Sequence, residues 1–203
     1  MSGNQTLEQE RSSGLRERLK RATLPAHQRL EESLGLLKAP LAPGRIFRTL
    51  QRFHGFHAAW EPALVPVVPA QLLLPRLKLS LLEQDLRGLG ATEASLGNAP
   101  TCYVARRLCR NEAAAAGSLY VMEGGSLGGQ VIVRALEHTG WFSPRRPSYW
   151  NPYGADTGRR WTETVAYLES LPAGCADEAV ASAIACFELL HSWLLEDQRR
   201  THG

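Results

Sequence analysis

Apolar side chains recur at the spacing of an α-helix along most of this 203-residue chain. The first such run predicts a helix that begins after Ser13 as its N-cap, has a kink or a junction between two helices at Pro25, and ends at Gly35. Its apolar positions are Leu15, Leu19, Ala22, Ala26, Leu30 and Leu34. The run therefore predicts a helix with one buried face.

The same periodicity predicts further helices and no strand, so the expected fold class is all-α. One helix follows the Pro40/Pro43 turn and ends at the prolines at 62, 66 and 69. A second spans Leu72 to Leu89 and starts near Pro75. The others are expected over about Pro100 to Cys109, Thr157 to Leu171, and Ala176 to about Arg200. Residues 1–10 are polar without periodic apolar positions and are expected to form a flexible arm. Residues 11–203 are expected to form one multi-helix domain.

A glycine-rich stretch interrupts the most apolar of these patterns, between a helical run over Glu112–Met122 and another over Gln130–His138. Each glycine inside a helix costs roughly 0.5–1 kcal/mol relative to alanine, so four of them within six residues indicate a role. The four are Gly124, Gly125, Gly128 and Gly129, which form two adjacent stripes without side chains on one side of a helix. Such a surface suits either a tight helix–helix crossing or a closely bound ligand. A phosphate-binding loop is excluded because no Gly-Lys-Ser/Thr follows.

Composition and charge indicate a soluble globular protein and argue against nucleic-acid binding. Apolar residues make up 44% of the chain and charged residues 21%, as is usual for a soluble globular protein. The net charge of +3 is small and the arginines are interspersed with acidic residues, which argues against a nucleic-acid surface. The four cysteines form no C-x-x-C pair and follow no secretory signal, so reduced thiols in a cytoplasm without membrane attachment are expected.

His27 is the histidine whose neighbours indicate chemistry. Glu31, one turn later, can accept a hydrogen bond from one ring nitrogen and make the other a better metal ligand. Lys20 and Arg16 lie two and three turns earlier on the same face. An iron-containing apolar ring with carboxylates at one edge would match this line, with the iron on His27 and the carboxylates toward Lys20. A half-buried histidine beside a surface ion pair is the alternative.

The other histidines suggest no site. His54 and His57, three residues apart, could share a metal, but no third ligand has a recognisable spacing, and both are interpreted as residues at the edge of the core. His138 and His202 lie at expected helix ends, where imidazoles commonly meet backbone carbonyls.

Two segments, Leu19–His27 with Glu31 and Tyr120–Gln130, resemble the heme oxygenase family, most closely its bacterial biliverdin-forming branch that is often paired with bacteriophytochromes. The similarity spans most of the chain, with helices in the expected order. It implies that His27 is the proximal heme ligand, that Glu31 orients it, and that Lys20 meets a heme propionate.

The same resemblance implies a bent distal helix whose glycines lie against the heme. The heme contacts implied on this helix are Gly124, Gly128 and Gly129, and Tyr120 belongs to the same motif. Arg159 and Arg160, later in the chain, are implied as further partners of the propionates. Mammalian members carry an aspartate where this chain has Gly125. Glu123, Ser126 and Gln130 are alternatives for positioning the distal water, and the sequence does not choose among them.

The implied function is cleavage of heme to biliverdin, CO and ferrous iron, with O2 and an external reductant, and with heme hydroxylated at a meso carbon. A neutral histidine ligand fits, because it does not promote O–O cleavage as a thiolate does. The chain has no flavin or nicotinamide motif, so a ferredoxin or a flavin reductase is the expected electron donor, and a bilin-accepting phytochrome is a candidate partner. The alternatives are a non-degrading heme carrier or sensor of the same fold and a metal-free, thiaminase-like helical protein.

Overall fold

The structure is a computed structural model that describes residues 14–37, 41–139 and 148–200, with side chains as far as residue 196. The expected arm at residues 1–10 lies outside these ranges. Within them the regular secondary structure is helical, which confirms the all-α class. The longer helices are α2 (Leu15–Leu34), α3 (Pro43–Leu64), α5 (Leu79–Gly88), α7 (Glu112–Glu137), α8 (Thr157–Ser170) and α9 (Ala176–Arg200). The short ones are α4 (Ala70–Leu73), η1 (Leu74–Arg76), α6 (Glu93–Gly97), η2 (Tyr103–Cys109), η3 (Gly154–Asp156) and η4 (Ala173–Cys175).

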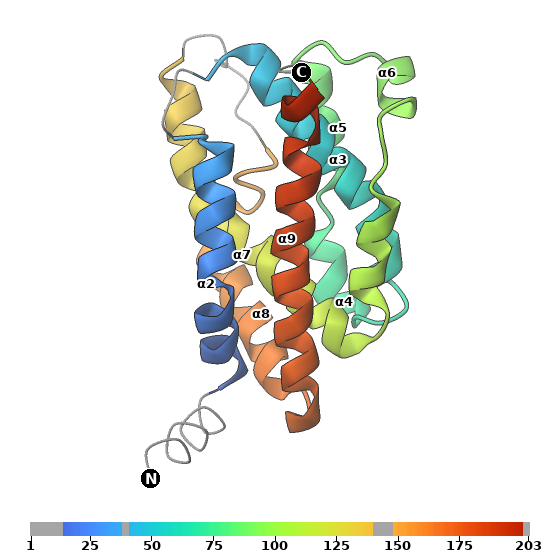
Figure 1. Cartoon of the computed structure of the whole chain (residues 1–203), viewed down its shortest axis with the longest axis vertical. Coiled ribbons are helices and arrows are strands. Elements are labelled where there is room, and N and C mark those ends of the chain that lie inside the picture. The colour runs from blue at the N-terminus through green and yellow to red at the C-terminus, as the bar shows by residue number, and fades with distance from the viewer. Residues whose placement is uncertain (1–13, 38–40, 140–147, 201–203) are drawn as a thin grey trace.

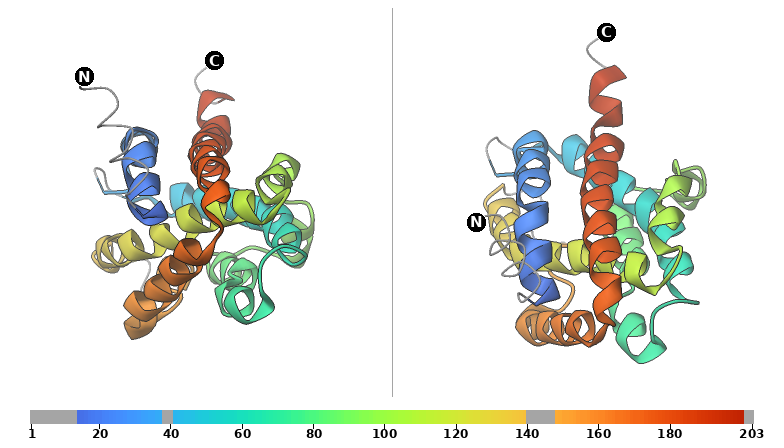
Figure 2. Two further views of the ribbon diagram at one scale, coloured as in Figure 1. Left: turned by 90° about the horizontal axis from the view of Figure 1, so that it is seen from below. Right: turned by 60° about the horizontal axis from the view of Figure 1, so that its bottom comes forward.

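Helix α9 is central to the packing. It runs beside α2 on one side and crosses the first half of α7 on another, as Figure 1 shows. Helix α3 packs on α5 and η2, and α8 packs on α7. The right view of Figure 2 shows α2 beside α9 and α7 crossing behind it. By length and composition alone, the stretch Ala173–Glu196 is apolar enough to cross a membrane. The contacts of α9 with α2 and α7 instead explain this apolarity as that of a core helix.

The crossing of α7 and α9 depends on Gly117. A Cβ atom at this position would lie 2.0 Å from the carbonyl oxygen of Ala179, so only glycine allows the two backbones to approach this closely. The Ser182 hydroxyl donates a hydrogen bond of 2.8 Å to the Ala114 carbonyl at the same crossing. The tight helix–helix contact therefore lies two turns before the glycine cluster.

The ends of α2 agree only partly with expectation. Gly14 is the N-cap, and Ser13, which was expected there, lies outside the described residues. The Glu169 carboxylate of α8 takes over the capping role, because it accepts the backbone N–H groups of Leu15 and Arg16 at 3.0 and 2.9 Å. The helix continues through Pro25 and ends at Gly35, which has the left-handed φ of 53°.

Other expected boundaries are wrong. The single helix expected over Leu72 to Leu89 is divided into α4, η1 and α5, because Pro75 cannot donate within a helix and Lys78 starts a new one. The helix expected from Pro100 is the 3₁₀ helix η2. Pro62 lies inside α3 rather than ending it. Helix α6, with a capping box at Thr92, was not anticipated.

Candidate functional site

The glycine cluster lies inside the continuous helix α7, and its members have different surroundings. A Cβ atom at Gly125 or Gly128 would meet nothing within 4 Å, and one at Gly124 would meet only the Trp161 ring, at 3.8 Å. At Gly129 it would lie 1.9 Å from the Trp150 carbonyl oxygen. The open, bare surface therefore comprises Gly124, Gly125 and Gly128. Gly129 is instead buried against the Trp150 backbone, and its expected heme contact stays a prediction.

Gly124 and Gly128 belong to an open face of α7 that is otherwise apolar. At roughly 100° per residue, Tyr120, Leu127 and Val131 fall within about 100° of this pair around the helix. Leu127 and Val131 are 44% and 50% exposed, although large apolar side chains are usually covered. This face of α7 thus combines bare backbone with uncovered apolar groups. We call it the glycine face.

The matching surface of α2 carries His27. Its Nε2 atom lies 3.1 Å from Glu31 Oε1, which confirms the expected pairing, and its side chain is 48% exposed. The Glu31 contact occupies one ring nitrogen and leaves the other for a ligand. The ring also lies 5.3 Å from that of Phe187 on α9, centroid to centroid. Leu24, on the same face of α2, is 49% exposed. His27 is therefore a fixed imidazole beside uncovered apolar surface.

Tyr120 joins the two surfaces. Its hydroxyl interacts with Thr23 of α2, one turn before His27, and the guanidinium of Arg16 lies close enough to influence it. Burial raises the pKa of Tyr120, while Thr23 and Arg16 oppose the shift. The Tyr120 ring lies 5.6 Å from that of Trp161, whose ring also borders Gly124. The His27 surface and the glycine face therefore border one region, with Lys20 exposed on its α2 side.

The polar side chains of the motif point away from this region. The Lys78 ammonium donates to Ser126 Oγ at 2.8 Å and lies 2.8 Å from Glu123 Oε1, and both partners are buried. Gln130 is half-buried and lies close to Glu123 around the helix. Glu123 and Ser126 are thus engaged behind α7, so neither of these alternatives for positioning a distal water faces the open region.

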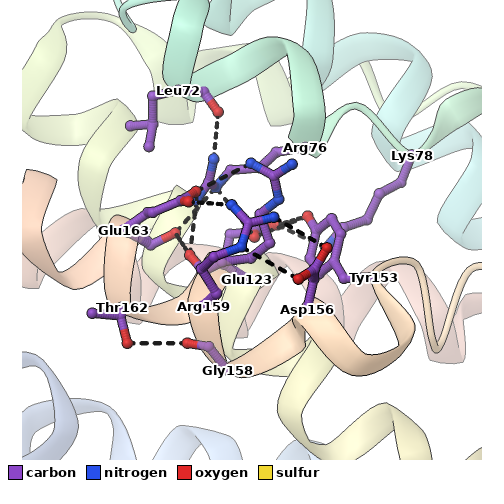
Figure 3. A network of polar contacts seen from close by, with 12 residues as sticks. Leu72, Arg76, Lys78, Glu123, Tyr153, Asp156, Gly158, Arg159, Thr162 and Glu163 are labelled. Atoms are coloured by element: carbon purple, nitrogen blue, oxygen red, sulfur yellow. Dashed lines mark hydrogen bonds and ion pairs between the residues drawn. The ribbon is translucent and has the colours of Figure 1, made fainter.

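Arg159 and Arg160, at the start of α8, form ion pairs with neighbouring carboxylates. Arg159 pairs with Asp156 at 3.1 Å and with Glu163 at 2.7 Å, and Arg160 pairs with Glu163 at 3.1 Å. Figure 3 shows Arg159 among these carboxylates, next to the buried Arg76. No contact among the described residues joins either arginine to Lys20 or His27. Their expected role as propionate partners stays a prediction.

His57 is fully buried and structural. Its Nδ1 lies 2.7 Å from Glu61 Oε1, and its Nε2 lies 3.2 Å from the Tyr149 hydroxyl. Burial lowers the pKa of His57, although Glu61 opposes the shift. His54 lies 3.8 Å from Glu83 instead of sharing a metal with His57. The described side chains contain no group of three His, Cys, Asp or Glu residues that could hold a metal.

Sequence reasoning missed several residues that shape the site. Trp161 and Phe187 each supply a ring, Thr23 meets Tyr120, and Lys78 reaches the back of α7. The apolar periodicity of the last helix included Phe187, and the sequence analysis assigned no role to Trp161. Nothing in the local sequence links Lys78 to a helix more than 40 residues later. An exposed leucine at position 24, between Lys20 and His27, was the signal available for an uncovered apolar surface.

Comparisons with known proteins give one consistent result. A profile of the family described as heme oxygenase matches residues 13–196. A heme oxygenase from Leptospira interrogans has a similar structure, with a TM-score of 0.75 and 18% identity over 91% of this chain and 100% of that one. Heme oxygenase-1 from the cyanobacterium Synechocystis sp. PCC6803, solved in complex with heme, gives a TM-score of 0.74 and 15% identity over 94% and 96%. Heme oxygenase 2 from Chlamydomonas reinhardtii, solved without heme, gives 0.71 and 15% over 90% and 96%. A comparison with curated proteins finds no match.

Proposed function

The chain belongs to the heme oxygenase family, and we propose that it binds heme between α2 and α7 and cleaves the ring oxidatively to biliverdin, CO and ferrous iron. The observation that carries the proposal is the pairing of two incomplete surfaces. An imidazole held by Glu31 at 3.1 Å lies on one helix, and bare backbone at Gly124 and Gly128 lies on the other. An apolar ring with one axial ligand would complete both.

The exposed side chains of this region fit heme in polarity. Leu24, Leu127 and Val131 are exposed large apolar side chains, and covering them removes apolar surface from water. No Cβ atom at Gly124, Gly125 or Gly128 would meet backbone, so their open side is not used by packing within the described protein. We therefore explain Gly124 and Gly128 by a ligand rather than by a helix crossing, since packing within the described residues accounts only for Gly129.

Each residue has a stated task in this proposal. His27 supplies a neutral nitrogen to the iron, and Glu31 accepts the hydrogen of the other ring nitrogen and so fixes the ring plane. Lys20 offers a cation to the propionates at the edge of the site. Gly124 and Gly128 allow close approach from the distal side, and Tyr120 and Trp161 border the ring edge. When bound, heme supplies both the iron that binds O2 and the ring that is oxidised.

The distal side is expected to favour oxidation of the ring over O–O cleavage by acid catalysis. The glycine face carries Tyr120, Leu127 and Val131 but no carboxylate or imidazole, because Glu123 and Ser126 are engaged by Lys78 on the other side. Such a surface restricts where a small distal ligand can lie without protonating it. Electrons must come from a separate donor, for which a ferredoxin or a flavin reductase is our expectation. Cytoplasmic location, a phytochrome partner and the bacteriophytochrome-associated branch stay predictions.

Hemin titration tests the proposal. Wild-type protein should give the absorption spectrum of histidine-ligated ferric heme, and then bilin absorbance when reductant and air are supplied. His27→Ala should lose that axial ligation, and added imidazole should restore it. His138→Ala is the matched control, because His138 is also exposed and its Nδ1 only contacts the Arg134 carbonyl, at 2.6 Å. Unchanged ligation in His27→Ala would refute the site, and heme that survives repeated reduction in air would show a carrier or sensor.

A further inference from the structure

Lys78 has an unusual position for a lysine, because its side chain is only 4% exposed and reaches another helix. It lies between η1 and α5, and its ammonium contacts one turn of α7. The three contacts are the Met122 carbonyl at 3.2 Å, the Ser126 hydroxyl at 2.8 Å and a Glu123 carboxylate oxygen at 2.8 Å. All three hydrogens of the ammonium therefore have acceptors within one turn.

This turn also carries the glycine face, on its opposite side. At roughly 100° per residue, the mean direction of positions 122, 123 and 126 is about 170° from that of positions 124 and 128. Lys78 therefore supports the helix from directly behind the proposed heme contact. Glycines give this turn little stiffness of its own, because they lack the side chains that restrict a helical backbone.

The support is anchored on several elements. Glu61 of α3 accepts the backbone N–H groups of Lys78 and Leu79 at 2.6 and 3.0 Å, which fixes where the lysine begins. Glu123 is also held by the Tyr153 hydroxyl at 2.9 Å and by Arg76 at 3.4 Å. Figure 3 shows Lys78, Arg76 and Tyr153 converging on Glu123 from different segments. The glycine turn is thus tied to α3, η1 and the segment before α8.

We propose that Lys78 is a positioning residue that holds the glycine face of α7 in the position required to contact heme. It acts through the Met122 carbonyl, Ser126 and Glu123, and does not touch the substrate. The charge pair with Glu123 replaces the stiffness that the four glycines remove. This inference rests on the proposed function for its purpose, but the physical coupling between Lys78 and the glycine turn exists without heme.

Hydrogen exchange of the heme-free protein tests that coupling separately from heme chemistry. Lys78→Met keeps the length of the side chain and removes its charge and donors. Amides of this variant in positions 124–131 should exchange about tenfold faster relative to those of α2, because charge-assisted bonds of this kind hold the turn closed. Lys78→Arg, which keeps the charge, should restore part of the protection.

Arg52→Met is the matched control. Arg52 is another buried cation, which lies on α3, pairs with Glu196 at 3.1 Å and lies over the Trp193 ring. It should lower the melting temperature without changing the exchange ratio between positions 124–131 and α2. An identical exchange pattern in both variants would reduce Lys78 to a general stabilising residue and overturn the proposal.

Hemin turnover adds a readout for positioning. Lys78→Met should give a changed ratio of bilin isomers, while Arg52→Met gives the ratio of the parent. If the parent itself forms no bilin, the proposed function fails, whereas the exchange result still decides the coupling. A local exchange effect with an unchanged isomer ratio would confine Lys78 to stiffening the turn and overturn its role in placing the heme.

Discussion

Alanine at the open glycines should stabilise the heme-free protein and impair it as a heme enzyme. At Gly128 the added methyl group meets nothing within 4 Å, and at Gly124 it meets only the Trp161 ring at 3.8 Å. Neither position has a left-handed φ that would penalise alanine. Both lie inside a continuous helix, so the usual preference for alanine applies. The Gly124→Ala/Gly128→Ala variant is therefore the informative perturbation.

The magnitude follows from helix propensity. Each replacement of an interior helical glycine by alanine gains about 0.8–1.0 kcal/mol, so the double variant should gain about 2 kcal/mol. For a chain of this length, that corresponds to a rise of roughly 4–8 °C in melting temperature. The same methyl groups would crowd a ring packed against the backbone. Overpacking of about 1–3 kcal/mol corresponds to roughly a five- to 150-fold weaker affinity for hemin.

Thermal unfolding by circular dichroism and hemin titration measure the two effects on the same samples. Gly125→Ala is the control for propensity alone. Its Cβ atom also meets nothing within 4 Å, but it points about 80° away from the Gly124/Gly128 direction, on the side opposite to Tyr120, Leu127 and Val131. It should raise the melting temperature and leave hemin binding unchanged. If all three alanines stabilise the protein and none weakens hemin binding, the glycine face is not the heme contact and the reasoning fails.

Three other variants test the frame around the site. Gly117→Ala places a Cβ atom 2.0 Å from the Ala179 carbonyl and should lower the unfolding free energy by at least about 2 kcal/mol in urea titrations, whereas a loss below about 0.5 kcal/mol would contradict the close crossing. Glu169→Ala removes the cap of α2 and should cost about 1 kcal/mol by the same measurement; no loss would mean that solvent caps the helix equally well. Burial lowers the pKa of His57, so below about pH 6.5 the unfolded chain takes up a proton that the native state does not. The unfolding free energy should therefore fall as the pH decreases toward the lowered pKa. The decrease is at most about 1.4 kcal/mol for each pH unit. His57→Gln should flatten this pH dependence between about pH 6.5 and the lowered pKa, and an unchanged slope there would assign it to other groups.

The sequence predicted the parts of the site that lie on a single helix. His27 and Glu31 are one turn apart on α2, and their contact at 3.1 Å follows from helical spacing alone. The positions of Gly124 and Gly128 on one face follow in the same way. The all-α class was predicted from apolar periodicity, and the end of α2 from Gly35, because both depend on residues close together in the sequence.

Features that depend on contacts between distant segments could not be predicted. Gly129 has the same local pattern as Gly128, and only the Trp150 backbone, brought in by the fold, distinguishes the two. Arg159 was a reasonable cation for an anionic ligand until its pairing with Asp156 and Glu163 was seen. Glu169 caps α2 across more than 150 residues of sequence, which no local signal marks. Such pairings depend on tertiary packing, which periodicity does not encode.

The free protein carries two unfavourable features that one ligand would remove together. The glycines cost helical stability, and Leu24, Leu127 and Val131 keep large apolar side chains in contact with water. Packing within the protein could have solved both, as it does at Gly117, yet Gly124 and Gly128 stay uncovered. A ligand that covers them binds only the folded state and so stabilises it by mass action. Heme binding in the proposed site would therefore explain the exposed region, and in our proposal the buried charges behind α7 hold its shape in the free protein.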